Sequence, residues 1–97
     1  MDEQRDFFRI KNKGDMLAQF EDQALNIIDM SASSVAITPE VKLPRTGILE
    51  LKINLFKIHL HFEVLSTNAE KTVLIFTNGD HVEKLLPVLK NLRRESE

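Results

Sequence analysis

The stretch ILELKINLFKIHLHFEV, residues 48–64, has the clearest structural pattern in this chain. Apolar and polar residues alternate along it, which is the pattern of strands with one buried face. The alternation changes parity at Phe56 and Lys57, as it would if these two residues formed the turn of a hairpin. In that register Leu55 would face Ile58, and one side of the hairpin would be wholly apolar. The stretch therefore predicts a β-hairpin that packs on a core.

Strand-like segments lie on both sides of this hairpin, and a helix follows them. Residues 35–38 fit a short strand, whereas residues 72–77 are apolar on both faces, which is typical of a central or covered strand. Leucines then recur at helical spacing from Asp80 onward, with Asp80 as the expected N-cap. Pro87 lacks a backbone N–H, so we expect a kink or a division into two helical pieces near it.

Residues 15–28 show a different periodicity. Met16, Phe20 and Ala24 fit one stripe of an amphipathic helix, with Asp15 as its cap. In a segment this short, such periodicity is weak support for a helix. The residues alone therefore leave the secondary structure of this segment open.

The composition bounds the class of protein. The 97 residues suffice for one compact domain, and an apolar share of 42% with charges of both signs indicates a globular one. A formal net charge of −2 argues against broad binding to DNA or RNA, which needs a basic face. The absence of cysteine excludes disulfides, thiolate metal sites and a cysteine nucleophile. With neither a signal-peptide pattern nor a bilayer-spanning apolar run, we expect a cytoplasmic protein without membrane insertion.

Two polar motifs carry the candidate ligand-binding residues. The first, RDFFR, holds Arg5 and Arg9, and the second, DMSASS, holds Asp29, Ser31 and Ser34. Two guanidinium groups can grip phosphates through paired N–H bonds, and a fixed carboxylate can accept hydrogen bonds from a base such as guanine. Together the motifs predict a site for an anion that also carries a hydrogen-bonding base.

The motifs resemble those of the PilZ family, bacterial receptor domains for cyclic di-GMP, whose signatures read RxxxR and [D/N]xSxxG. Arg5 and Arg9 complete the first signature, and Asp29 and Ser31 match the second. Ser34 stands where the family has glycine. A serine at this position adds a Cβ where the family lets the ligand approach, so it bears directly on affinity.

The resemblance implies a mainly β fold, a small six-stranded antiparallel PilZ-like barrel with a C-terminal helix. Residues 15–97 would form this single domain, and residues 1–14 would be a flexible arm that carries the arginines. The resemblance places strands at residues 16–20 and in the segment that runs into Asp29, with a turn at residues 21–23. We follow it over the helical periodicity, because the barrel needs these strands to close.

The resemblance also implies a function, a receptor or adaptor domain for cyclic di-GMP with no cofactor. Arg5 and Arg9 would contact phosphates and stack on guanine, Asp29 would recognise guanine, and Ser31 would contact the ligand or support the loop. Ligand binding would order the arm and create a face for a protein partner. The alternative is an interaction module that does not bind the nucleotide, which Ser34 favours. The leucine-rich helix could cover one end of the barrel or pair with a second subunit.

Other candidate residues have simpler explanations. His59, His61 and Glu63 share one strand face and would offer metal ligands, but alternation alone produces this arrangement. We therefore predict a solvent-facing side and no metal site there. Arg45, in the turn before the hairpin, could approach the rim that carries the motifs. The sequence contains no Gly-x-Ser-x-Gly, P-loop or His-Glu-x-x-His motif, so we do not expect an enzyme.

Overall fold

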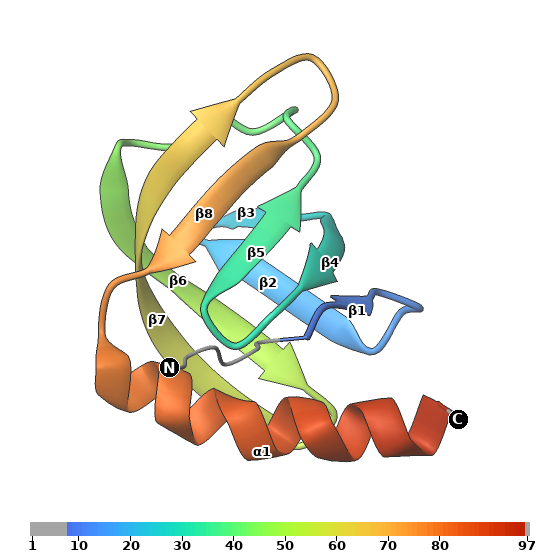
Figure 1. The fold of residues 1–97 in the computed structure, drawn as a ribbon. Coiled ribbons are helices and arrows are strands. Elements are labelled where there is room, and N and C mark those ends of the chain that lie inside the picture. Colours follow the sequence, from blue (N-terminus) through green and yellow to red (C-terminus); the bar gives the residue numbers. More distant parts are fainter. Residues whose placement is uncertain (1–7, 97) are drawn as a thin grey trace.

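The computed structural model describes residues 8–96 of the chain (Figure 1). This part of the chain is mainly β, with one helix at its C-terminal end, as the sequence predicts. The strands are β1 (Ile10–Lys11), β2 (Met16–Phe20), β3 (Gln23–Leu25), β4 (Ile27–Met30), β5 (Ser34–Ile37), β6 (Thr46–Ile53), β7 (Phe56–Thr67) and β8 (Thr72–Phe76), and the helix is α1 (Gly79–Ser96).

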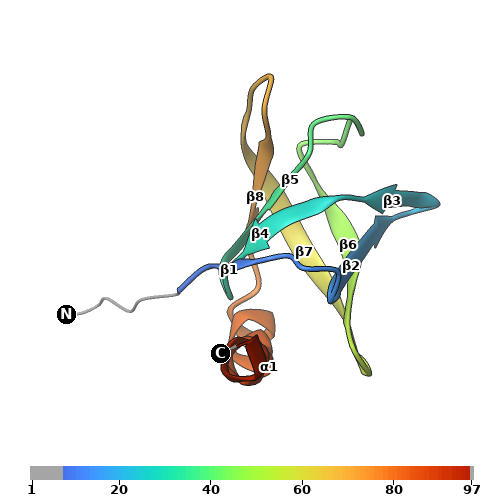
Figure 2. The ribbon, with the colours of Figure 1, turned by 90° about the vertical axis from the view of Figure 1, so that its right-hand side faces the viewer.

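The strands form one antiparallel sheet of eight in the order β1-β4-β5-β8-β7-β6-β2-β3. β3 lies at one edge and β4 lies next to the other edge, yet only Asn26 separates them in the chain. The sheet therefore curls until its two ends approach, as Figure 2 shows. The curled half-barrel has eight strands instead of six, because the two-residue β1 adds one and Asn26 divides the strand expected to run into Asp29.

The side chain of Asn12 joins the two ends of the curled sheet. Its Nδ2 donates to the carbonyl oxygens of Met16 and Ile27, each at 3.1 Å, and so links β2 to β4. Its Oδ1 accepts from the backbone N–H of Gly14 at 2.9 Å and of Met16 at 3.2 Å. Asn12 thus satisfies backbone groups at a seam where no strand ladder does so. Residues 8–14, assigned to the arm by the sequence, contribute β1 and this seam to the fold.

The β6–β7 hairpin has the expected faces but a different turn. Ile53 pairs with Phe56, so the turn consists of Asn54 and Leu55, and the predicted turn at Phe56 and Lys57 is wrong. Asn54 has a φ of 55°, a conformation that asparagine tolerates better than most residues with a Cβ. Leu55, expected in the apolar face, is 99% exposed at the tip. The turn chemistry of asparagine therefore outweighs the apolar pattern at this point.

The segment from residue 15 to residue 28 forms strands, and the helical periodicity has no counterpart in the structure. β2 pairs with β6, which buries Met16 and Ala18 and leaves Leu17 and Gln19 toward solvent. Pairing between β2 and β3 leaves two residues, 21 and 22, as the turn. Of the residues in the helical stripe, Met16 is buried and Phe20 is half-buried, whereas Ala24 is exposed, so the stripe does not correspond to one buried face.

Helix α1 differs from its predicted form at two positions. Asn78, instead of the predicted Asp80, caps it, because Asn78 Oδ1 accepts from the backbone N–H of Asp80 at 2.9 Å and of His81 at 3.4 Å. The helix is also continuous through Pro87, so of the two predicted outcomes, a kink or a division into two pieces, the division is wrong. Pro87 and Glu83, whose carbonyl loses its helical partner, are both exposed, so water can satisfy that carbonyl.

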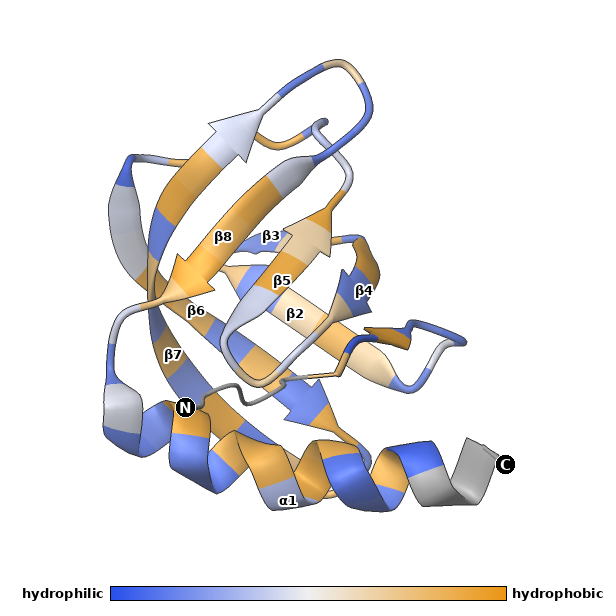
Figure 3. Ribbon diagram, viewed as in Figure 1, coloured by the Kyte–Doolittle hydropathy of each residue, from blue (hydrophilic) through white to orange (hydrophobic). Residues whose placement is uncertain are grey.

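One apolar core lies between the curled sheet and α1 (Figure 3). Leu85, Leu89 and Leu92 of the helix are buried in it together with inward-facing strand residues such as Leu51 and Phe62. These helix leucines are therefore used within the chain and are not left for a second subunit. No helix within the described residues is long and apolar enough to cross a membrane.

Candidate ligand-binding site

The pairing of β1 with β4 brings the two sequence motifs together. Ile10 lies opposite Met30, and Lys11 lies opposite Asp29. Arg9 directly precedes β1, so its side chain starts beside Asp29, 20 positions away in the chain. The meeting of the motifs therefore follows from the register of a two-residue strand.

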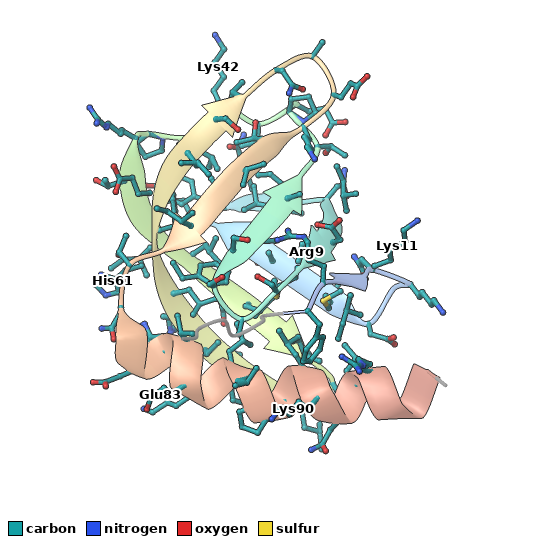
Figure 4. All side chains as sticks on the ribbon, in the orientation of Figure 1. Arg9, Lys11, Lys42, His61, Glu83 and Lys90 are labelled. Atoms are coloured by element: carbon teal, nitrogen blue, oxygen red, sulfur yellow. The ribbon has the colours of Figure 1, made fainter. Side chains whose placement is uncertain are left out.

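Arg9 binds residues of the second motif directly. Its Nη2 and Nε both donate to Asp29 Oδ1, at 2.7 and 3.1 Å, and its Nη1 donates to Ser34 Oγ at 2.7 Å. The side chains of Arg9 and Asp29 are 41% and 26% exposed, so the cluster lies at the protein surface. Figure 4 shows Arg9 over the part of the sheet formed by β4 and β5. Among the described residues, Asp29 Oδ2 has no hydrogen-bond partner, which leaves one acceptor of this carboxylate open.

Ser31 supports the loop between β4 and β5. It is 2% exposed, and its Oγ accepts from the backbone N–H of Ser33 at 3.2 Å and of Ser34 at 3.1 Å. Its own N–H donates to the carbonyl oxygen of Ser34 at 2.8 Å. These bonds define a tight polar turn that presents Ser34 to Arg9.

Ser34 replaces the motif glycine without backbone strain. Within residues 8–96 the non-glycine residues with positive φ are Glu21 and Asn54, so the backbone of Ser34 does not require glycine. Its effect on the site comes from the hydroxyl, which accepts from Arg9. Ser34 therefore gives Arg9 a hydrogen-bond partner that the glycine of the family motif would not provide.

The strand register adds neighbours that sequence reasoning did not place. Ile75 of β8 lies opposite Ser34, and Glu63 of β7 lies opposite Ile75. Two strand spacings separate Ser34 from Glu63, or roughly 10 Å. Arg45 Nε lies 3.9 Å from Glu63 Oε2, so Arg45 lies on this side of the sheet but pairs with Glu63. No sequence signal marks Ile75, because its place depends on the pairing of distant strands.

Phe8 connects the candidate site to helix α1. Its ring lies under the guanidinium carbon of Arg93, 4.4 Å from the ring centroid, and packs against the core. Arg5, the other arginine of the first motif, lies outside the described residues.

The histidine face forms no metal cluster in the part of the chain described. His59 and His61 are exposed, and Glu63 pairs with Arg45. The ring of His61 instead lies beside that of His81, with centroids 5.6 Å apart. Within residues 8–96 there is no group of three His, Cys, Asp or Glu side chains placed to hold an ion.

The described residues form a small domain with a curled antiparallel sheet, a C-terminal helix across its end and an arginine bonded to an Asp-x-Ser turn at the surface. A family model described as PilZ domain-like matches residues 9–97, and the chain belongs to this PilZ-like family. The crystal structure of an uncharacterized Legionella protein, Lpg0364, is similar to this chain, with 33% sequence identity and a TM-score of 0.88. That match covers 93% of this chain and 98% of the Legionella chain. No curated protein sequence matches the chain.

Proposed function

We propose that this domain is a cytoplasmic receptor for cyclic di-GMP that acts through a protein partner and not as an enzyme. One observation carries the proposal. Arg9 of the first motif contacts Asp29 and Ser34 of the second, so both halves of the motif pair meet at one surface position. The cluster holds a cation for a phosphate, and Asp29 retains an oxygen for the N–H groups of guanine.

Ligand binding would exchange the partners of Arg9. In the structure its N–H groups are directed at Asp29 and Ser34, and a phosphate would have to compete for them. An exposed ion pair is worth about 0–1 kcal/mol, so its loss is a small cost beside two charge-assisted bonds to a phosphate. Arg5 would add the second guanidinium, and the part of the N-terminal arm before Phe8 would become ordered around the ligand. A higher affinity of the ligand for the ordered state is what would transmit occupancy to a partner.

The proposal is tested by isothermal titration of the domain with cyclic di-GMP, with GTP as the control ligand. We expect saturable binding of cyclic di-GMP alone. Replacing Arg9 with alanine should weaken it by about 100-fold, because two charge-assisted hydrogen bonds are lost. Arg45→Ala is the matched control, since Arg45 is an exposed arginine on the same face that pairs with Glu63. Undiminished affinity in a folded Arg9→Ala variant would contradict the assignment.

A second candidate function is a PilZ-like interaction module that does not bind the nucleotide. The hydroxyl of Ser34 favours it, because its bond to Arg9 adds to the Asp29 ion pair and occupies a third N–H of the guanidinium. Ser34→Gly discriminates between the two functions. A large gain in affinity would show that the serine impairs a competent site, whereas a flat titration for both proteins would favour the interaction module.

A further inference from the structure

A surface pocket lies away from the Arg9 cluster. It has a volume of about 410 Å³ and is lined by residues of β2, β3, β6 and the start of β7, including Leu17, Ala24, Asn26 and Lys52. β2, β3 and β6 lie together on the right of Figure 2, whereas the Arg9 cluster lies on β4 and β5. Pockets that hold small ligands typically measure about 300–1,000 Å³, so this one is of sufficient size.

The topology explains why the sheet is hollow at this position. β3 pairs with β2 only from Ala18 to Phe20, and Leu17 lies beyond that pairing. The chain then leaves β3 through Asn26 and enters β4 on the other side of the seam. Leu17 therefore has no partner on β3, and the pocket extends from this position over side chains of β6 and β7, among them Lys52 and Lys57.

The pocket carries a positive charge that no residue from 8 to 96 neutralises. Lys52 and Lys57 lie directly opposite each other on β6 and β7, an arrangement that is unfavourable for like charges. Glu50 Oε2 lies 3.1 Å from Lys57 Nζ and compensates one of them. Lys52 has no ion pair or side-chain hydrogen bond with any residue that the structure describes. One ammonium group in the pocket therefore remains available to an anion.

A large apolar side chain lies next to this ammonium group. Leu17 is opposite Lys52 in the β2–β6 pairing and is 60% exposed. Side chains directly opposite on neighbouring strands have Cβ atoms about 5 Å apart, so one small molecule can contact both. A cation and an exposed leucine at that separation match an anionic head group on an apolar body.

We propose that this pocket binds a small amphiphilic anion, a carboxylate or phosphate ester with an apolar body. Lys52 pairs with the anionic group, and Leu17 with the carbon atoms of Ala24 covers the apolar part. The site shares no residue with the Arg9 cluster, so its occupancy can be tested separately from nucleotide binding. A negative result for this pocket would therefore leave the proposed receptor function untouched, and a negative result for the receptor function would leave the pocket proposal untouched.

The test is a titration of the ¹⁵N-labelled domain followed by two-dimensional NMR. The probes are octanoate and octyl phosphate, with octanol and acetate as controls that keep only the apolar body or only the charge. We expect saturable shifts at the amides of Ala18, Ala24 and Lys52 with one or both anions, and affinities at least about 10-fold weaker for both controls. Equal binding of octanol, or no saturable shift with either anion, would overturn the proposal.

Matched variants separate this pocket from general surface binding. Lys52→Gln and Leu17→Ser should each lower the affinity for the anion by about 5-fold or more, because each removes one half of the recognition. Lys71→Gln and Leu65→Ser are the controls, since Lys71 is exposed in the β7–β8 loop and Leu65 is 63% exposed outside the pocket. An equal loss in the controls would identify non-specific association and reject the site. Arg9→Ala should leave the affinity for octanoate unchanged.

Discussion

Asn12 and Arg9 lie three positions apart in the chain. The side chain of each makes several hydrogen bonds, but to different kinds of partner. Asn12 bonds to backbone groups of β2 and β4 in a partly buried seam. Arg9 bonds to the side chains of Asp29 and Ser34 at the surface. Backbone partners are fixed by the strands, so they move only if the sheet opens, whereas side-chain partners can be exchanged for water or a ligand. The comparison separates a residue that holds the fold from one that is free to change partners.

The largest effect is expected for Asn12→Ala. The substitution removes four hydrogen bonds and leaves backbone groups of Met16 and Ile27 unsatisfied at the seam. Each buried group left without a partner costs about 1–3 kcal/mol, so we expect the free energy of unfolding to fall by about 3 kcal/mol. Urea denaturation followed by circular dichroism measures this change.

Asn91→Ala is the control for Asn12→Ala. Asn91 is exposed on α1, and alanine favours helix, so the free energy of unfolding of this variant should differ from that of the unchanged domain by less than about 0.5 kcal/mol. If Asn12→Ala also changed stability by so little, the seam would not depend on this side chain and the contrast with Arg9 would be lost.

The same distinction explains what the sequence could predict of the fold. Alternation over residues 48–64 identified the buried faces of β6 and β7, because a strand that buries every second residue has apolar and polar residues in alternation. The turn was misplaced because the apolar Leu55 hid the conformational signal of Asn54. The sequence also could not reveal the seam, since Asn12 bonds to backbone groups that every residue carries.

For the candidate site, the sequence supplied residue types but not their contacts. Arg9, Asp29 and Ser34 were selected by motif, and the structure places them in one hydrogen-bonded cluster. That Ser34 would accept from Arg9 depends on the β4–β5 loop, and that Ile75 would lie beside it depends on the β5–β8 register. Such long-range pairings are set by the whole sheet, so local patterns do not contain them.

A smaller effect is expected for the contact of Phe8 with Arg93. Phe8 is adjacent to Arg9 but packs on the core and on the helix, so we expect it to behave more like Asn12. In a double-mutant cycle with Phe8→Leu and Arg93→Gln, we expect a coupling energy of about 0.5–1 kcal/mol, the value typical of an exposed cation–π pair. The cycle uses urea denaturation of the four proteins.

The cycle has a clear negative result. Arg93 makes a further interaction, so its single substitution also changes stability through that contact, and the cycle removes this contribution. Coupling near zero would show that Phe8 is not fixed by the helix.

The smallest effect is expected for the Arg9–Asp29 ion pair, whose dependence on salt distinguishes it from the hydrogen bonds of Asn12. The pair is partly exposed, so a cycle with Arg9→Gln and Asp29→Asn should give about 0.5 kcal/mol at low ionic strength. In 1 M NaCl the Debye length falls to about 3 Å, and most of this coupling should disappear. The loss of stability in Asn12→Ala should persist in the same salt, because its bonds join neutral groups. A salt-resistant Arg9–Asp29 coupling of several kcal/mol would instead make Arg9 a structural residue, and a ligand could then no longer take over its partners at small cost.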